Sequence, residues 1–140
     1  MFINKVEHIG IAVKDISAAN ELYTRLMGAA PYKMEVVESE YVLTSFFKVG
    51  ETKIELLQAT APESAIAKFI EQRGEGMHHI AYEVADIRQA MQQADQQGFR
   101  LLNQQPKRGA DNKWVCFLHP KTCGGTLVEF CQEIEDDNDE

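Results

Sequence analysis

At 140 residues, of which 44% are hydrophobic, the chain is long enough to bury one core, and a second independent domain is not expected. The net charge of -8 argues against nucleic acid as a partner, and no apolar run approaches the roughly 20 residues that a membrane helix needs. The chain opens without the basic region and long apolar segment of a signal peptide, and its three cysteines fall late in the sequence, so we expect a cytoplasmic protein with reduced thiols.

The opening strand contains the first candidate site residue. Residues 5–13 alternate, so that Ile9, Ile11 and Val13 point to one side. His8 shares the other side with small residues, which is the pattern of a half-buried strand. A lone histidine on such a strand more often packs in the core than binds a ligand. A chemical role for His8 therefore needs support from elsewhere in the sequence.

A helix and three strands are predicted to follow. Asp15 or Ser17 can cap the helix, and Gly28 is placed to end it. The apolar residues expected to form its buried stripe are Ile16, Ala19, Leu22, Tyr23 and Leu26. The three strands are expected at about 32–38, 41–49 and 52–58.

A connecting helix and a second set of the same elements come next. Pro62 is expected to start the connecting helix, and Gly74 and Gly76 to end it. In the second set, Asp86 can cap a helix that Gly98 ends. Three strands would then follow, at about 99–103, 114–119 and 126–132.

The second set repeats the first in sequence as well as in order. The segment 8–16, HIGIAVKDI, aligns without a gap with the segment 79–87, HIAYEVADI. His, Ile, Val, Asp and Ile recur at equal offsets in the two segments. An internal repeat of this kind indicates two related structural modules. His79 is therefore the counterpart of His8.

The coarse order is βαβββ twice, which predicts an α+β fold within a single domain over residues 1–132. The two modules span about 5–58 and 78–132, and the connecting helix at about 62–73 belongs to neither. Residues 133–140 contain six acidic side chains, which leave the rest of the chain nearly balanced in charge. We therefore expect an acidic, disordered tail.

Each module ends in a strand that contains a glutamate among apolar residues. Glu55 lies 47 residues after His8, and Glu129 lies 50 residues after His79. An isolated buried carboxylate costs several kcal/mol, or its pKa rises until it is neutral, so each glutamate needs a partner. Two histidines and two glutamates at matching places suggest one divalent metal held between the two modules.

Alternatives exist for single members of this set. A salt bridge to Lys53 or Lys68 could account for the buried carboxylate of Glu55. It would not account for a second glutamate, Glu129, at the matching place in the other module. His78 competes with His79, but strand alternation places His78 on the opposite face, where it would pack or orient its neighbour. Imidazole and carboxylate ligands suit Co, Ni, Zn, Mn or Fe. Four protein ligands in a six-coordinate ion would leave two positions for a chelating substrate, whose enolate the ion would stabilise as a Lewis acid.

Segments along most of the chain also carry a family resemblance. They are residues 5–13, 53–57, 66–69, 73–81, 117–121 and 124–129. Together they closely resemble the methylmalonyl-CoA epimerase family of the vicinal oxygen chelate superfamily, to which glyoxalase I also belongs. The most specific segment is the His-Pro-Lys at 119–121 with the Gly-Gly that follows it. The resemblance extends from about residue 5 to about residue 132.

The resemblance implies a fold, a metal site and a reaction. The fold is a cupped mixed sheet of two βαβββ modules, usually in a homodimer. The metal, which the resemblance favours as Co over Zn, Ni, Mn or Fe, would be bound by His8, Glu55, His79 and Glu129. The implied reaction interconverts (2R)- and (2S)-methylmalonyl-CoA through a metal-stabilised enolate. A small acyl-CoA is therefore the expected partner, with no nucleic acid and no membrane.

The resemblance further implies two carboxylate bases, one for each face of the reacting carbon. Glu129, at the metal, would serve one face, and a glutamate near residue 38 would serve the other. Glu38 lies 17 residues before Glu55, a spacing that suits the base of the family. We favour Glu38 over Glu40, because Glu40 adjoins a predicted turn. Tyr41 stands where the family commonly has glycine, which keeps both glutamates as candidates.

Other functions remain alternatives. A lactoylglutathione lyase of the glyoxalase I type uses the same four ligand types and a related enediolate. A non-catalytic small-molecule-binding protein of the same fold typically lacks the metal ligands, so the full set counts against it. An iron dioxygenase with two histidines and one carboxylate is disfavoured, because both glutamates are present.

Overall fold

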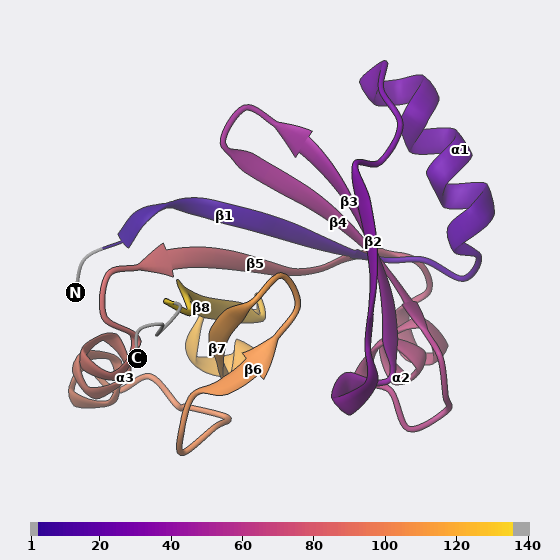
Figure 1. Ribbon diagram of the computed structural model, residues 1–140. Helices are drawn as coiled ribbons and strands as arrows, with labels where there is room; N and C mark the ends of the chain where they lie inside the picture. Colours follow the sequence, from indigo (N-terminus) through magenta and orange to yellow (C-terminus); the bar gives the residue numbers. More distant parts are fainter. Residues whose placement is uncertain (1–2, 136–140) are drawn as a thin grey trace. The chain divides into compact units, whose positions relative to one another are not determined.

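The computed structural model describes residues 3–135 and divides into two compact units (Figure 1). One unit is Glu7–Ile80, and the other combines residues 3–6 with residues 81–135. The first set of elements comprises β1 (Ile3–Ala12), α1 (Ile16–Met27), β2 (Lys33–Val37), β3 (Val42–Val49) and β4 (Thr52–Ala59). The connecting helix α2 (Ala65–Arg73) precedes β5 (Gly76–Val84), α3 (Ile87–Gln96), β6 (Lys107–Gly109), β7 (Lys113–Leu118) and β8 (Val128–Glu133). The observed order is thus the predicted βαβββ arrangement, repeated once.

In the unit Glu7–Ile80, four strands form a mixed sheet in the order β2-β3-β4-β1. β3 is antiparallel to both β2 and β4, whereas β1 is parallel to β4 with His8 opposite Lys53 and Gly10 opposite Glu55. This register places the predicted metal ligands of β1 and β4 on neighbouring strands.

One helix packs on each face of the sheet of this unit, and Figure 1 labels these helices α1 and α2. Ile16 and Ala19 of α1 pack with Phe47 and Leu56. The opposite face packs against α2 through a separate cluster, Ala12, Val42, Leu57 and Ile66. Because side chains alternate along a strand, the face with Ala12 and Leu57 also receives His8, Gly10 and Glu55.

The other unit has its own core. β8, β7 and β6 are antiparallel neighbours, with Glu129 of β8 opposite Phe117 of β7. Its apolar cluster joins α3 to β7 and β8 through Val84, Ile87, Ala90, Met91, Ala94, Cys116, Leu118 and Phe130. Cys116 and Cys131 are buried, and these two and Cys123 are free thiols.

The two aspartate caps predicted from the sequence are confirmed. The Asp15 carboxylate accepts hydrogen bonds from the backbone N–H groups of Ser17 and Ala18, at 3.0 and 3.2 Å. Asp86 does the same for Gln89 at 3.1 Å. Each bond satisfies a backbone donor that has no partner within the first turn of the helix. The repeated aspartate therefore has the same structural role in both modules.

The predicted strand at 99–103 is wrong. Among the described residues of this segment, only Leu101 forms a bridge, with Leu118, and the strand before β7 is instead β6. The side-chain oxygen of Asn103 accepts the backbone N–H of Phe117 at 2.8 Å. The backbone N–H of Phe117 therefore donates to a side chain rather than to a backbone carbonyl of the segment 99–103. The pairing of this segment with β7 is thus limited to the bridge between Leu101 and Leu118.

Two helix predictions also need correction. In α1, Leu22 is 51% exposed and Leu26 is 70% exposed, although both were expected in the buried stripe. The buried side is narrower, and Tyr23 and Met27 complete it. The connecting helix α2 begins at Ala65 rather than at Pro62, because the Ser64 hydroxyl caps it by accepting the N–H of Ile66 at 3.1 Å.

The predicted acidic tail, 133–140, begins within the last strand, since β8 extends through Glu133. Its final part, 136–140, lies outside the described residues. Within residues 3–135, no helix combines the length and the apolar character that crossing a bilayer would require.

Candidate metal centre

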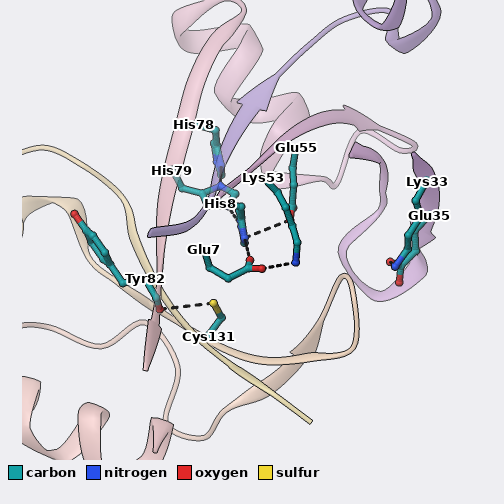
Figure 2. Close-up of polar contacts among 10 residues, drawn as sticks. All are labelled: Glu7, His8, Lys33, Glu35, Lys53, Glu55, His78, His79, Tyr82 and Cys131. Carbon is teal, nitrogen blue, oxygen red and sulfur yellow. Dashed lines mark hydrogen bonds and ion pairs between the residues drawn. The ribbon is translucent and has the colours of Figure 1, made fainter. Parts of the chain in front are cut away.

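His8 and His79 face each other within the unit Glu7–Ile80 (Figure 2). Their Nε2 atoms are 3.0 Å apart, and their rings meet edge to face at an interplanar angle of 87°. Both side chains are buried. The two histidines that the sequence repeat matched, 71 positions apart, are therefore direct neighbours.

Gly10 makes room for this arrangement. A Cβ atom at position 10 would lie 2.2 Å from Cε1 and 2.6 Å from Nδ1 of His79, which is far inside van der Waals contact. The His79 ring thus lies directly over the backbone of β1, two residues beyond His8. Any larger residue at position 10 would have to displace the ring.

We expect Gly10→Ala to weaken metal binding while the protein still folds. The added methyl group would push the His79 ring away from His8, and displacing a metal ligand through its support commonly costs about 10- to 100-fold in affinity. Isothermal titration with Co²⁺ measures the affinity, and a thermal unfolding curve of the metal-free variant reports the fold. Unchanged Co²⁺ affinity in a folded variant would show that the position of the His79 ring does not matter for the metal.

Glu55 is the third predicted ligand in this unit. It is buried on β4, and its Oε2 lies 3.3 Å from Nδ1 of His8. His8, His79 and Glu55 therefore form one connected cluster. Glu129, the fourth predicted ligand, is buried on β8 of the other unit.

The cluster contains two residues that were not among the predicted site residues, Glu7 and Lys53. The carboxylate of Glu7 accepts a hydrogen bond from Nδ1 of His8 at 2.6 Å, and its other oxygen lies 2.5 Å from Nζ of Lys53 (Figure 2). Burial raises the pKa of the Glu7 carboxyl, but the hydrogen bonds to His8 and Lys53 outweigh burial and lower this pKa to about 2. Glu7 is therefore ionised at neutral pH.

His78 lies beside His79, and its expected role in orienting its neighbour agrees with the geometry. The Nδ1 atoms of the two rings are 2.9 Å apart, so one donates a hydrogen bond to the other. His78 also meets Phe69 of α2 edge to face. Strand alternation alone would have separated the two histidines, but their rings are close enough to meet.

The two imidazoles fit a metal ion by their donor atoms and their spacing. Two nitrogens that each bind one ion at about 2.1 Å, at a right angle to each other, lie about 3.0 Å apart. The separation between Nε2 of His8 and Nε2 of His79 is 3.0 Å. Nδ1 of His8 contacts Glu7, and Nδ1 of His79 contacts His78, whereas the two Nε2 atoms contact each other, so a shared ion would bind at Nε2 of both rings.

A second set of ligand-type atoms overlaps the first. One ligand atom from each of Glu7, His8 and Glu55 lies within 4.8 Å of the others. Lys53 counts against a metal there, because its ammonium group touches the Glu7 carboxylate and would repel a cation. We therefore favour the site at the two Nε2 atoms.

The two candidates for the second base lie in one short turn. β2 ends at Val37, and Glu38–Glu40 forms a 3-10 helix that closes on Tyr41, whose φ is 54°. Strand alternation therefore stops before Glu38. Glu38 is exposed, whereas Glu40 is half-buried.

Known proteins similar to this chain define its superfamily and its family. The model of the Glyoxalase/Bleomycin resistance protein/Dioxygenase superfamily matches residues 7–117, so the chain belongs to this superfamily. The ethylmalonyl-CoA/methylmalonyl-CoA epimerase of Cereibacter sphaeroides is 40% identical over 132 residues, which cover 93% of this chain and 98% of the relative. Within the superfamily, the chain belongs to the methylmalonyl-CoA epimerases, a family of enzymes.

Two further comparisons agree. Human mitochondrial methylmalonyl-CoA epimerase is 37% identical over 131 residues, which cover 93% of this chain and 74% of the human protein. A variant of Streptomyces coelicolor methylmalonyl-CoA epimerase, solved in complex with 2-nitronate-propionyl-CoA, is 33% identical, with a TM-score of 0.91. The match covers 96% of this chain and 100% of that structure. The predicted fold of paired βαβββ modules is therefore confirmed.

Proposed function

We propose that this protein is a metal-dependent epimerase that interconverts (2R)- and (2S)-methylmalonyl-CoA. The observation that carries the proposal is the buried pair of imidazoles, His8 and His79, with Glu55 beside them, in a chain of the methylmalonyl-CoA epimerase family. The α-carbon of the substrate lies between a thioester and a carboxylate. An epimerase must remove the proton from this carbon and return one to its opposite face.

The proposed site contains residues of two kinds, which are metal ligands and general bases. His8, His79, Glu55 and Glu129 would hold one divalent ion, which we propose to be Co²⁺. When bound, this ion supplies a Lewis acid that favours the enolate of the thioester. Glu129 exchanges a proton with one face of the α-carbon, and Glu38 exchanges a proton with the other face. Two bases are needed because one fixed carboxylate does not easily reach both faces of a planar carbon.

The ligand in the Streptomyces coelicolor complex supports an enolate. That structure contains 2-nitronate-propionyl-CoA. A nitronate is a planar anion with two oxygens, and it resembles the planar enolate that proton removal from methylmalonyl-CoA would produce. Another neighbour, 33% identical with a TM-score of 0.90, is a methylmalonyl-CoA epimerase in complex with methylmalonyl-CoA and NH₄⁺. Both complexes support an acyl-CoA as the substrate here.

The proposal extends to the organisation of the protein. The two modules would form one domain over residues 1–132, with an acidic tail after it, and two chains would associate as a homodimer in the cytoplasm. Size-exclusion chromatography with light scattering measures the oligomeric state. A monomer at micromolar concentration would contradict the homodimer and leave the proposed reaction untouched.

Solvent exchange tests the reaction. In deuterated water, the metal-loaded protein should introduce deuterium at the α-carbon of methylmalonyl-CoA, because proton removal is the central step from either epimer. Mass spectrometry of the recovered thioester measures the exchange, and the metal-free protein is the control. We expect no turnover of the hemithioacetal formed from methylglyoxal and glutathione. Turnover of that adduct without exchange into methylmalonyl-CoA would replace the epimerase with a lyase of the glyoxalase I type.

A further inference from the structure

Glu7 and Lys53 form a buried pair of charged residues next to the Nδ1 atom of His8, and neither has yet been given a role. Glu7 is 1% exposed, which makes it one of the most deeply buried charged residues among those the structure describes. It lies directly before a proposed metal ligand, and its carboxylate oxygens contact two different groups, Nδ1 of His8 and Nζ of Lys53 (Figure 2). Such a costly arrangement calls for a reason beyond packing.

We propose that Glu7, held in place by Lys53, fixes the His8 ring with its proton on Nδ1 and its Nε2 lone pair directed at the metal. Glu7 is thus a positioning residue that acts through His8. The inference rests on the proposed metal-dependent function, because it assigns Nε2 of His8 as the atom that binds the ion.

The hydrogen bond determines which nitrogen carries the proton. A neutral imidazole has one N–H and one lone pair, and an ionised carboxylate can only accept. The contact of 2.6 Å between Glu7 and Nδ1 therefore requires the proton on Nδ1. Oε2 of Glu55 lies 3.3 Å from the same nitrogen, so a second carboxylate group is also near Nδ1. Nε2 is left unprotonated, as a metal ligand must be.

Lys53 keeps the carboxylate in place. It is opposite His8 in the parallel pairing of β1 and β4, so its side chain starts beside the ring. Its Nζ contacts Oε2 of Glu7, while Oε1 of Glu7 is engaged with His8. One carboxylate oxygen thus faces the lysine and the other faces the histidine.

The other module lacks this carboxylate. His78 occupies the position that Glu7 occupies in the first module, directly before the repeated histidine, and it contacts Nδ1 of His79 at 2.9 Å. A neutral histidine can donate or accept, so His78 does not by itself select a tautomer of His79. The carboxylate of Glu7 therefore favours the Nδ1–H tautomer of His8, whereas His79 has no corresponding carboxylate directly before it in the sequence. Glu7 is for this reason the residue to test.

The test compares the tautomer of His8 with metal affinity in the same variants. Glu7→Gln removes the charge and offers an amide N–H that can donate to Nδ1, which favours the opposite tautomer. Glu7→Asp keeps an accepting carboxylate. Glu21→Gln, on the exposed surface of α1, removes the same charge away from the site and is the matched control. Because Glu7→Gln removes the charge that the Lys53 ammonium contacts and could unfold the protein, Glu7→Gln with Lys53→Met is made as well.

Two measurements are made at one fixed alkaline pH. The ¹⁵N shifts and two-bond couplings of the His8 ring in the metal-free protein report the tautomer, and isothermal titration with Co²⁺ reports the affinity. The wild-type protein and Glu21→Gln should have His8 protonated at Nδ1. The folded Glu7→Gln variants should shift toward Nε2–H and lose Co²⁺ affinity by about 10- to 100-fold. Glu7→Asp should recover the Nδ1–H form and part of the affinity.

The outcomes separate this inference from the proposed function. An unchanged His8 tautomer and unchanged Co²⁺ affinity in a folded Glu7→Gln variant would overturn the role of Glu7, even if the wild-type protein epimerises methylmalonyl-CoA. A wild-type protein that binds Co²⁺ with the expected tautomer and yet fails to epimerise would overturn the proposed function and support the role of Glu7.

Discussion

Replacing His79 or Glu129 by alanine should abolish both tight binding of a divalent ion and turnover of methylmalonyl-CoA. Each change removes one of four proposed ligand atoms, and removing the side chain leaves no substitute donor at that position. Inductively coupled plasma mass spectrometry of the purified wild-type protein should find about one ion per chain after loading, as one four-ligand site requires. In His79→Ala the ion should be lost during gel filtration.

The control for this experiment comes from the same strand as Glu129. Glu133, at the exposed end of β8, is replaced by alanine, and this variant should retain the ion and the activity. Thermal unfolding of each metal-free variant separates a lost ligand from a lost fold, since a large-to-small change in a buried position can itself cost about 2 to 5 kcal/mol. Unaltered metal affinity in both His79→Ala and Glu129→Ala would remove the site assignment.

Glu38→Gln should reduce epimerisation by about 100-fold or more, as removal of a general base commonly does. If Glu38 serves one face of the α-carbon and Glu129 the other, the variant should still exchange the α-proton of the epimer that Glu129 deprotonates. Exchange from each pure epimer in deuterated water, followed by mass spectrometry, therefore distinguishes a missing base from a general loss of activity. Metal affinity should not change, because Glu38 is not among the proposed ligands.

Glu40→Gln is the matched variant, made two residues further along the same turn. Both glutamates lie in the 3-10 helix Glu38–Glu40, and they differ in exposure, since Glu38 is exposed and Glu40 is half-buried. We expect Glu40→Gln to be nearly normal. The reverse pattern would move the second base to Glu40, and two nearly normal variants would defeat a mechanism with two glutamate bases.

The parts of the fold that depend on local chemistry could be predicted from the sequence. An aspartate before each helix and a glycine after the first are signals that act within a few residues, and the caps at Asp15, Asp86 and Gly28 are as expected. Side-chain alternation likewise predicted that His8 and Gly10 share a face, and both are buried. The strand at 99–103 was wrong because a single side chain, Asn103, takes a backbone N–H that would otherwise extend the ladder.

The sequence repeat by itself determined that His8 and His79 are equivalent positions in two βαβββ modules and that a glutamate follows each of them. Only the tertiary structure decided how the rings are held. The approach of the His79 ring to Gly10, and the pairing of Glu7 with Lys53, depend on which residues of different strands stand side by side. Periodicity along one strand fixes the face of each side chain, but the register between strands is set by the packing of the whole core, so these contacts appear only once the chain is folded.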